Sequence, residues 1–130
     1  MVRPLAKSVY VCDDVFGDAS TGKIIVVNLW ETARIPTDEA FPYSLPKLCV
    51  FVWWRNGHGS ARTRIDIVEA GSGKLLRRTK DYILKFSDPS ETVYARYMIK
   101  DFVFPDVGSY IVEVYCEDEF VDDQVIRVVQ

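Results

Sequence analysis

The sequence predicts an all-β fold, an antiparallel sandwich of about seven to eight strands in two packed sheets. Short runs of β-branched and other apolar residues, alternating with polar ones, cover nearly the whole chain and favour strands over helices. Clusters of turn-forming residues separate these runs at intervals of roughly 8–12 residues, which is typical of a sandwich. Tyr110 follows Asp106 and Gly108 at the start of one apolar run, a pattern typical of a fixed turn that leads into a central strand.

Strands are expected in the first half of the chain at residues 7–14, 23–30 and 47–55. The second of these contains four consecutive β-branched residues at 24–27, which suit a pleated surface. The stretch between the second and third, residues 31–46, contains three prolines that lack a backbone N–H donor. We therefore expect residues 31–46 to cross between the sheets as an irregular segment.

The second half is expected to hold strands at residues 62–70, from Leu75 onward, and at residues 92–104, 110–117 and 121–129. Gly71, Ser72 and Gly73 form a tight reversal before Leu75, because glycine adopts the backbone angles that such a turn requires. Side chains alternate along a strand. The side chains expected to face the core are therefore Leu48, Val50, Val52 and Trp54 on one central strand and Tyr110, Val112, Val114 and Cys116 on another.

Length and composition predict one globular domain spanning residues 1–130. Hydrophobic residues make up 48% of the chain and charged residues 27%, which is enough apolar material for a core. The net charge of -3 provides no basic field, so nucleic-acid binding is not expected. No apolar run precedes Ser8 and no stretch is long enough to span a membrane, so we expect a cytoplasmic protein.

Three cysteines, Cys12, Cys49 and Cys116, stand far apart in apolar runs. Their odd number and spacing suit small buried side chains better than a disulfide framework or a zinc site. We therefore expect no disulfide and no cofactor.

The segment Asp106, Gly108 and Tyr110 resembles the tyrosine corner of immunoglobulin-like and fibronectin-like sandwiches. The resemblance implies that Trp53 or Trp54 is the core tryptophan of the facing strand. It also implies that no disulfide joins the sheets, because Val112 stands where those folds place a cysteine. Several short motifs further resemble a family of small bacterial all-β proteins with no assigned activity: Val11-Cys12-Asp13-Asp14, Gly22-Lys23, Phe41-Pro42 and Leu45-Pro46-Lys47-Leu48. This second resemblance implies a bacterial origin and supplies no active site.

No catalytic constellation stands out. His58 is the only histidine, and it lies in a glycine-rich turn with no recognisable nucleophile beside it. Gly71-Ser72-Gly73-Lys74 lacks the preceding glycine and following helix of a phosphate-binding loop. We therefore predict that the protein is not an enzyme.

Two charged clusters allow a ligand-binding interpretation. Asp13 and Asp14 close the first expected strand, and Asp118 and Asp122 flank the last expected hairpin. These side chains supply oxygen atoms of the kind that calcium binds, although without the spacing of a calcium loop. The basic run at residues 76–80 forms a positive edge that an anion could bind. Acidic loops and basic edges are more often simply hydrated, and we predict no metal site.

The main functional prediction is a protein-binding face. Phe51 and Trp53 have outward parity on one central strand, as do Ile111 and Tyr115 on another. If these strands are neighbours, the four side chains form one apolar patch, and such patches mark contact sites. The alternatives are that residues 31–46 fold across the patch, or that a β-bulge reverses the parity.

Two classes of function follow. The favoured one is a non-catalytic protein-interaction module, a homodimer or an adaptor that uses the aromatic face. The alternative is a ligand-binding sandwich that holds calcium through its acidic loops or carbohydrate through exposed aromatic rings.

Overall fold

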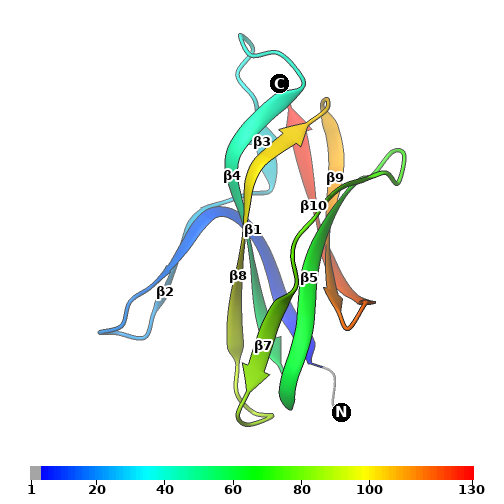
Figure 1. Cartoon of the computed structure of the whole chain (residues 1–130). Coiled ribbons are helices and arrows are strands. Elements are labelled where there is room, and N and C mark those ends of the chain that lie inside the picture. The colour runs from blue at the N-terminus through cyan, green and yellow to red at the C-terminus, as the bar shows by residue number, and fades with distance from the viewer. Residues whose placement is uncertain (1–3) are drawn as a thin grey trace.

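A computed structural model describes residues 4–130, and residues 1–3 of the expected domain lie outside this range. Ten strands and no helix make up the described chain (Figure 1). The strands are β1 (Leu5–Gly17), β2 (Ile24–Leu29), β3 (Thr32–Arg34), β4 (Tyr43–Arg55), β5 (Gly59–Glu69), β6 (Leu75–Arg78), β7 (Tyr82–Phe86), β8 (Val93–Phe104), β9 (Gly108–Cys116) and β10 (Glu119–Val129). Since residues 4–130 contain no helix, none of their elements is a helix that could cross a membrane.

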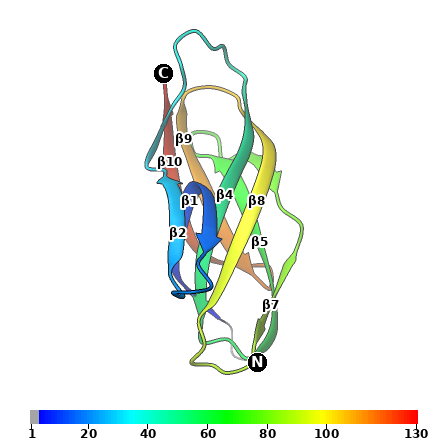
Figure 2. The same ribbon diagram turned by 90° about the vertical axis from the view of Figure 1, so that its left-hand side faces the viewer.

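The strands form two sheets that pack face to face (Figures 1 and 2). Sheet A has the order β2-β1-β4-β8, and sheet B has the order β3-β10-β9-β5-β6, with β7 also pairing with β5. Every pair is antiparallel except β3 with β10, which is parallel. The predicted immunoglobulin-like sandwich is therefore confirmed.

The core lies between the sheets and follows the predicted alternation. Leu48, Val50, Val52 and Trp54 of β4 are fully buried, as are Val112, Val114 and Cys116 of β9. Trp54, and not Trp53, is the core tryptophan. The parity predicted from the sequence is correct for both strands.

The tyrosine corner is also confirmed. Tyr110 is buried, and its hydroxyl donates to the carbonyl oxygen of Asp106 over 2.5 Å. Gly108, which begins β9, has a φ of 143°, a backbone conformation that a side chain disfavours. Phe104 packs against the Tyr110 ring with 5.1 Å between centroids, so this corner joins β8 to β9.

Tyr110→Phe is expected to lower the free energy of unfolding by about 0.5–1.5 kcal/mol, because one buried hydrogen bond is lost while the ring stays in place. A urea melt measures this difference. An unchanged midpoint would show that the hydroxyl contributes nothing to the corner.

Two predictions about the elements are wrong. There are more than seven to eight strands, because β3 and β7 were not expected. The stretch 31–46 is not wholly irregular: it contains β3 and the first residues of β4. Pro46 lies inside β4, where pairing with β8 continues on both sides because proline removes only its own N–H.

The strand expected from Leu75 is divided into β6 and β7. Thr79 follows β6 and pairs with Ile65 of β5 through two 2.9 Å hydrogen bonds: the Thr79 N–H donates to the Ile65 carbonyl oxygen, and the Ile65 N–H donates to the Thr79 hydroxyl oxygen. Lys80 and Asp81 then leave the sheet before β7 begins at Tyr82. This interruption leaves an irregular edge on sheet B.

Candidate interaction surface

The predicted four-residue patch does not exist. Phe51 and Trp53 lie on β4 in sheet A, whereas Ile111 and Tyr115 lie on β9 in sheet B. Because the two sheets pack through their inner faces, their outward side chains point in opposite directions. The prediction failed because β4 and β9 are not neighbours, although the outward parity of all four residues was correct.

On the outer face of sheet A, Phe51 and Trp53 belong to an aromatic cluster with Tyr10 and Tyr94. Phe51 stacks on Tyr94 with 5.9 Å between centroids and on Tyr10 with 6.5 Å. Trp53 meets Tyr94 edge-on with centroids 5.3 Å apart. The cluster joins three neighbouring strands, β1, β4 and β8, on one face.

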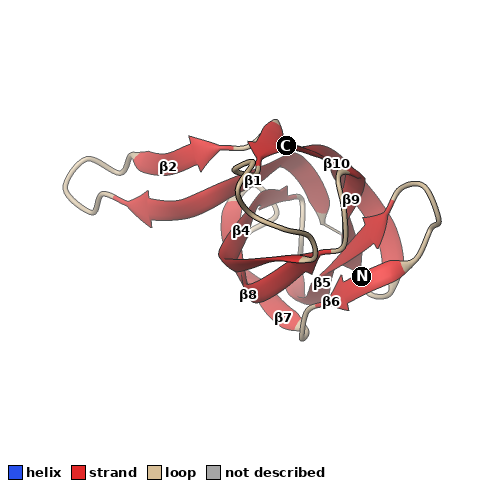
Figure 3. Ribbon diagram, turned by 90° about the horizontal axis from the view of Figure 1, so that it is seen from above, coloured by secondary structure: helices blue, strands red, loops and turns tan. Residues whose placement is uncertain are grey.

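This aromatic cluster is partly covered by a hairpin arm formed by the end of β1 and by β2. β1 pairs with β4 up to Cys12 and then continues from Asp14 to Gly17 paired only with β2. The arm projects from the sandwich beyond the outer face of sheet A (Figures 1 and 3). Figure 2 looks onto this side of the molecule, with the arm nearest the viewer.

A second, small hydrophobic cluster forms where the arm meets the sheet. Val15 and Ile24 of the arm belong to one hydrophobic cluster with Phe51, and Phe51 is only 3% exposed. Part of the outer face is therefore covered, as one alternative proposed, but by the arm and not by residues 31–46. Phe41 and Tyr43 of that segment pack instead against the main core.

Asp14 holds the arm against sheet A by polar contacts. Its carboxylate accepts a 2.8 Å hydrogen bond from the Val15 N–H and lies 3.1 Å from Lys47 Nζ and 3.4 Å from Arg96 Nε. The Val15 N–H and then the Lys47 side chain lower the pKa of Asp14 below its ordinary value. The ionised form is therefore the one that fastens the arm.

Asp14→Asn is expected to lower stability at neutral pH, and the difference from wild type should shrink in acid. The native carboxylate has a lowered pKa, so its contribution is complete above the pKa of the unfolded chain and is lost as pH falls through the lower native pKa. Urea melts of both proteins from pH 7 to pH 2 measure this. A difference that stays constant over the whole range would contradict the role given to Asp14.

The arm exposes large apolar side chains. Phe16 is 52% exposed, its cross-strand partner Ile25 is 54% exposed and Leu29 is 61% exposed. β2 pairs with β1 on one side and is the end strand of sheet A on the other. Its second edge thus presents backbone groups without a strand partner, beside apolar side chains.

The outer face of sheet B is different in character. The Arg64 guanidinium lies over the Tyr115 ring at 4.4 Å, and Arg64 also pairs with Asp66 and Asp118. Tyr115 donates to Glu113 over 3.2 Å. Tyr115 is therefore part of a polar network within one sheet and not an open aromatic anchor.

The other residues that the sequence analysis considered for catalysis or ligand binding lie apart from one another. His58 is exposed in the turn between β4 and β5, and residues 71–73 form the predicted turn between β5 and β6. Cys12, Cys49 and Cys116 are buried, as predicted, and the first two stand opposite each other on β1 and β4.

The acidic side chains are similarly dispersed. Asp13 accepts hydrogen bonds from Asn28 and Trp30, and Asp118 from Arg62 and Arg64. Within residues 4–130, no group of three or more His, Cys, Asp or Glu side chains is placed to hold a metal ion.

Comparison with known proteins places the chain in a family without assigning an activity. It resembles the crystal structure of an immunoglobulin-like protein from Pseudomonas aeruginosa, with 13% sequence identity over 98% of this chain and 96% of that one and a TM-score of 0.39. No curated protein matches the chain. A family model described as "Family of unknown function (DUF6941)" matches residues 7–129, and the chain belongs to that family.

Proposed function

We propose that this protein is a non-catalytic interaction module that self-associates through its hairpin arm. Two copies pair antiparallel along their β2 strands about a twofold axis, which joins the two A sheets into one continuous sheet. A six-residue strand offers a pairing length of about 20 Å. The arm takes the contact role that the sequence suggested for Phe51 and Trp53.

The single observation that carries the proposal is the chemistry of the β2 edge. Proteins usually protect free sheet edges with charged side chains, prolines or very short strands. The other free edges of residues 4–130 follow this rule: β3 is short, β6 has Arg77 and Arg78, and β7 has Lys85. β8 has Arg96 and Lys100, whose charges disfavour pairing with an uncharged strand such as β2. β2 contains no charged residue and no proline.

The exposed side chains of the arm also favour a second copy of this protein as the partner. Ile25 and Leu29 on β2 and Phe16 beside them remain about half or more exposed. A twofold axis brings each copy's apolar side chains against those of the other, because a symmetric contact uses the same surface twice. Burial of this surface adds to the hydrogen bonds gained along the strand edge.

Sedimentation equilibrium of the wild type and Ile25→Lys tests the proposal. We expect a wild-type dimer at micromolar concentrations. We expect Ile25→Lys to raise the dimer dissociation constant at least about tenfold, or about 1.4 kcal/mol. The reason is that a twofold contact places two lysines in one apolar interface.

Val125→Lys is the matched control, since Val125 is also a half-exposed β-branched residue but lies on β10 of sheet B. It should leave the dissociation constant unchanged, and melting curves should show that both variants fold. A wild type that stays monomeric, or equal weakening by the two substitutions, would end the proposal.

A further inference from the structure

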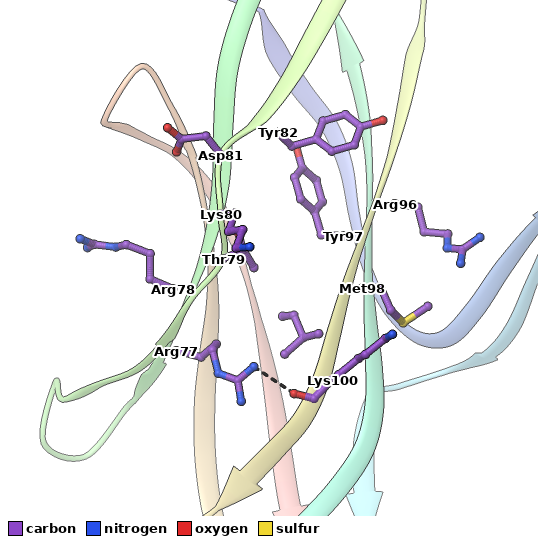
Figure 4. A pocket seen from close by; sticks show the side chains of 11 residues that line it. Arg77, Arg78, Thr79, Lys80, Asp81, Tyr82, Arg96, Tyr97, Met98 and Lys100 are labelled. Atoms are coloured by element: carbon purple, nitrogen blue, oxygen red, sulfur yellow. Dashed lines mark hydrogen bonds between the residues drawn. The ribbon is translucent and has the colours of Figure 1, made fainter.

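A second candidate site lies at the opposite edge of sheet A, where the two sheets separate. A cleft of about 560 Å³ opens between β8 and the segment that links β6 to β7 (Figure 4). One wall consists of residues 77–82 and the other of residues 96–100. The volume is within the range of ligand sites, about 300–1,000 Å³.

Each wall of the cleft is a run of consecutive residues, which indicates that the cleft is lined by backbone. Successive side chains of a strand point to opposite faces, so only the main chain and its edge can line a cavity continuously. The cleft therefore runs along a strand edge of β8. On this side β8 has no neighbouring strand, because sheet A ends there.

The direction of the β8 backbone groups follows from one hydrogen bond. Arg77 donates to the carbonyl oxygen of Lys100 over 3.0 Å from across the cleft, as Figure 4 shows. It also donates to the carbonyl oxygen of Asp101 over 2.9 Å, because a φ of 52° at Asp101 interrupts the regular strand there. Backbone groups of alternate residues point to the same edge of a strand. In the regular part of β8 before Asp101, we therefore infer that the N–H and C=O groups of Arg96 and Met98 also face the cleft, as Lys100 does.

The charge of the cleft is positive. Arg78 is held by Asp66 on the outer face of sheet B and Arg96 by Asp14 on the outer face of sheet A, so these two guanidiniums are already neutralised. Lys80 and Lys100 are exposed and have no ion pair with any residue in 4–130.

The one acid that lines the cleft is already engaged. The Asp81 carboxylate lies 3.7 Å from Arg62 Nε. Two lysine ammonium groups thus remain at the rim for an anionic partner.

Apolar side chains lie on the core side of the β8 wall. Tyr97 and Ile99 are buried, and the Tyr82 ring meets Tyr97 edge-on with 5.4 Å between centroids. A strand lying along β8 would direct alternate side chains toward these residues and the others toward solvent. The matching ligand alternates apolar and acidic residues.

We propose that this cleft binds an extended segment of another protein, with alternating apolar and acidic side chains, as an added strand on β8. Main-chain hydrogen bonds to Arg96 and Met98 supply affinity, and carboxylates paired with Lys80 and Lys100 supply selectivity. The bound segment is about five residues long, since residues 96–100 span roughly 16 Å as a strand. This site is independent of self-association through β2.

The test uses a capped peptide of alternating valine and glutamate, titrated into the ¹⁵N-labelled protein and followed by NMR. We expect saturable shifts at the amides of residues 77–82 and 96–100. Lys80→Glu combined with Lys100→Glu should weaken binding at least about tenfold. The matched control, Lys74→Glu combined with Lys85→Glu, changes the net charge equally outside the cleft and should have no effect.

Two further probes separate strand addition from simple ion binding. A version of the peptide with alternate backbone nitrogens methylated keeps its charges but cannot pair, and it should not bind. Inorganic phosphate should not displace the unmodified peptide. Absence of shifts up to millimolar peptide, equal binding of the methylated peptide, or displacement by phosphate would each overturn the proposal.

Discussion

Phe51→Ala is expected to lower the free energy of unfolding by about 3–5 kcal/mol, the cost of truncating a buried phenylalanine. Phe51 has outward parity on sheet A, yet it is only 3% exposed, in one hydrophobic cluster with Val15 and Ile24 of the arm and with Tyr10 and Trp53 of the sheet. The loss should appear in a urea melt of dilute, monomeric protein, because the cover belongs to the same chain.

Phe120→Ala is the control, since Phe120 is half exposed on β10. Phe120→Ala should lower the free energy of unfolding much less than Phe51→Ala does. A double-mutant cycle of Phe51→Ala with Val15→Ala should give a coupling free energy of at least about 0.5 kcal/mol, as expected for contacting residues. A Phe51→Ala variant as stable as the wild type would show that the arm does not cover the sheet.

The second large effect is expected for Asp66→Ala on the outer face of sheet B. Asp66 is 3% exposed and accepts hydrogen bonds from Arg78 at 2.9 and 3.0 Å and from Arg64 at 3.3 Å. These bonds fasten the short edge strand β6 to β5. We expect a loss of roughly 1.5–3 kcal/mol, the range for hydrogen bonds to charged groups.

Thermal or urea unfolding measures the loss, with Asp123→Ala as an exposed carboxylate control that should change stability by less than about 0.5 kcal/mol. Arg78→Lys should recover only part of the wild-type stability, because an ammonium cannot reproduce the two-point contact of a guanidinium. Equal stability of Asp66→Ala and Asp123→Ala would show that the network does not hold β6.

Local features of the fold were predictable because they depend on residues close in sequence. Tyr110 and Asp106 are four residues apart, so the corner is visible as a motif. Inward and outward parity on β4 and β9 follows from alternation within each strand. Strand pairing depends on contacts between distant segments, and one sequence does not reveal it. The assumption that β4 and β9 lie side by side in one sheet was therefore wrong.

The candidate site was missed for a related reason. Residues 24–27 were correctly predicted as strand. Their β-branched pattern does not show that they pair only with the end of β1, which continues past Cys12 and leaves sheet A as an arm. One signal was present: the second expected strand contains no charged residue between Lys23 and Glu31. An uncharged strand is unremarkable inside a sheet and becomes informative only when it lies at an edge.

Amide hydrogen exchange of β2, measured at protein concentrations below and above the dimer dissociation constant, tests the central claim most directly. Pairing of two β2 edges gives new hydrogen bonds to backbone N–H groups that face solvent in the monomer. We predict that such amides in Ile24–Leu29 exchange more slowly at the higher concentration, and that Ile25→Lys removes this dependence. Exchange in β2 that is the same at both concentrations, in a wild type that sediments as a dimer, would contradict the account.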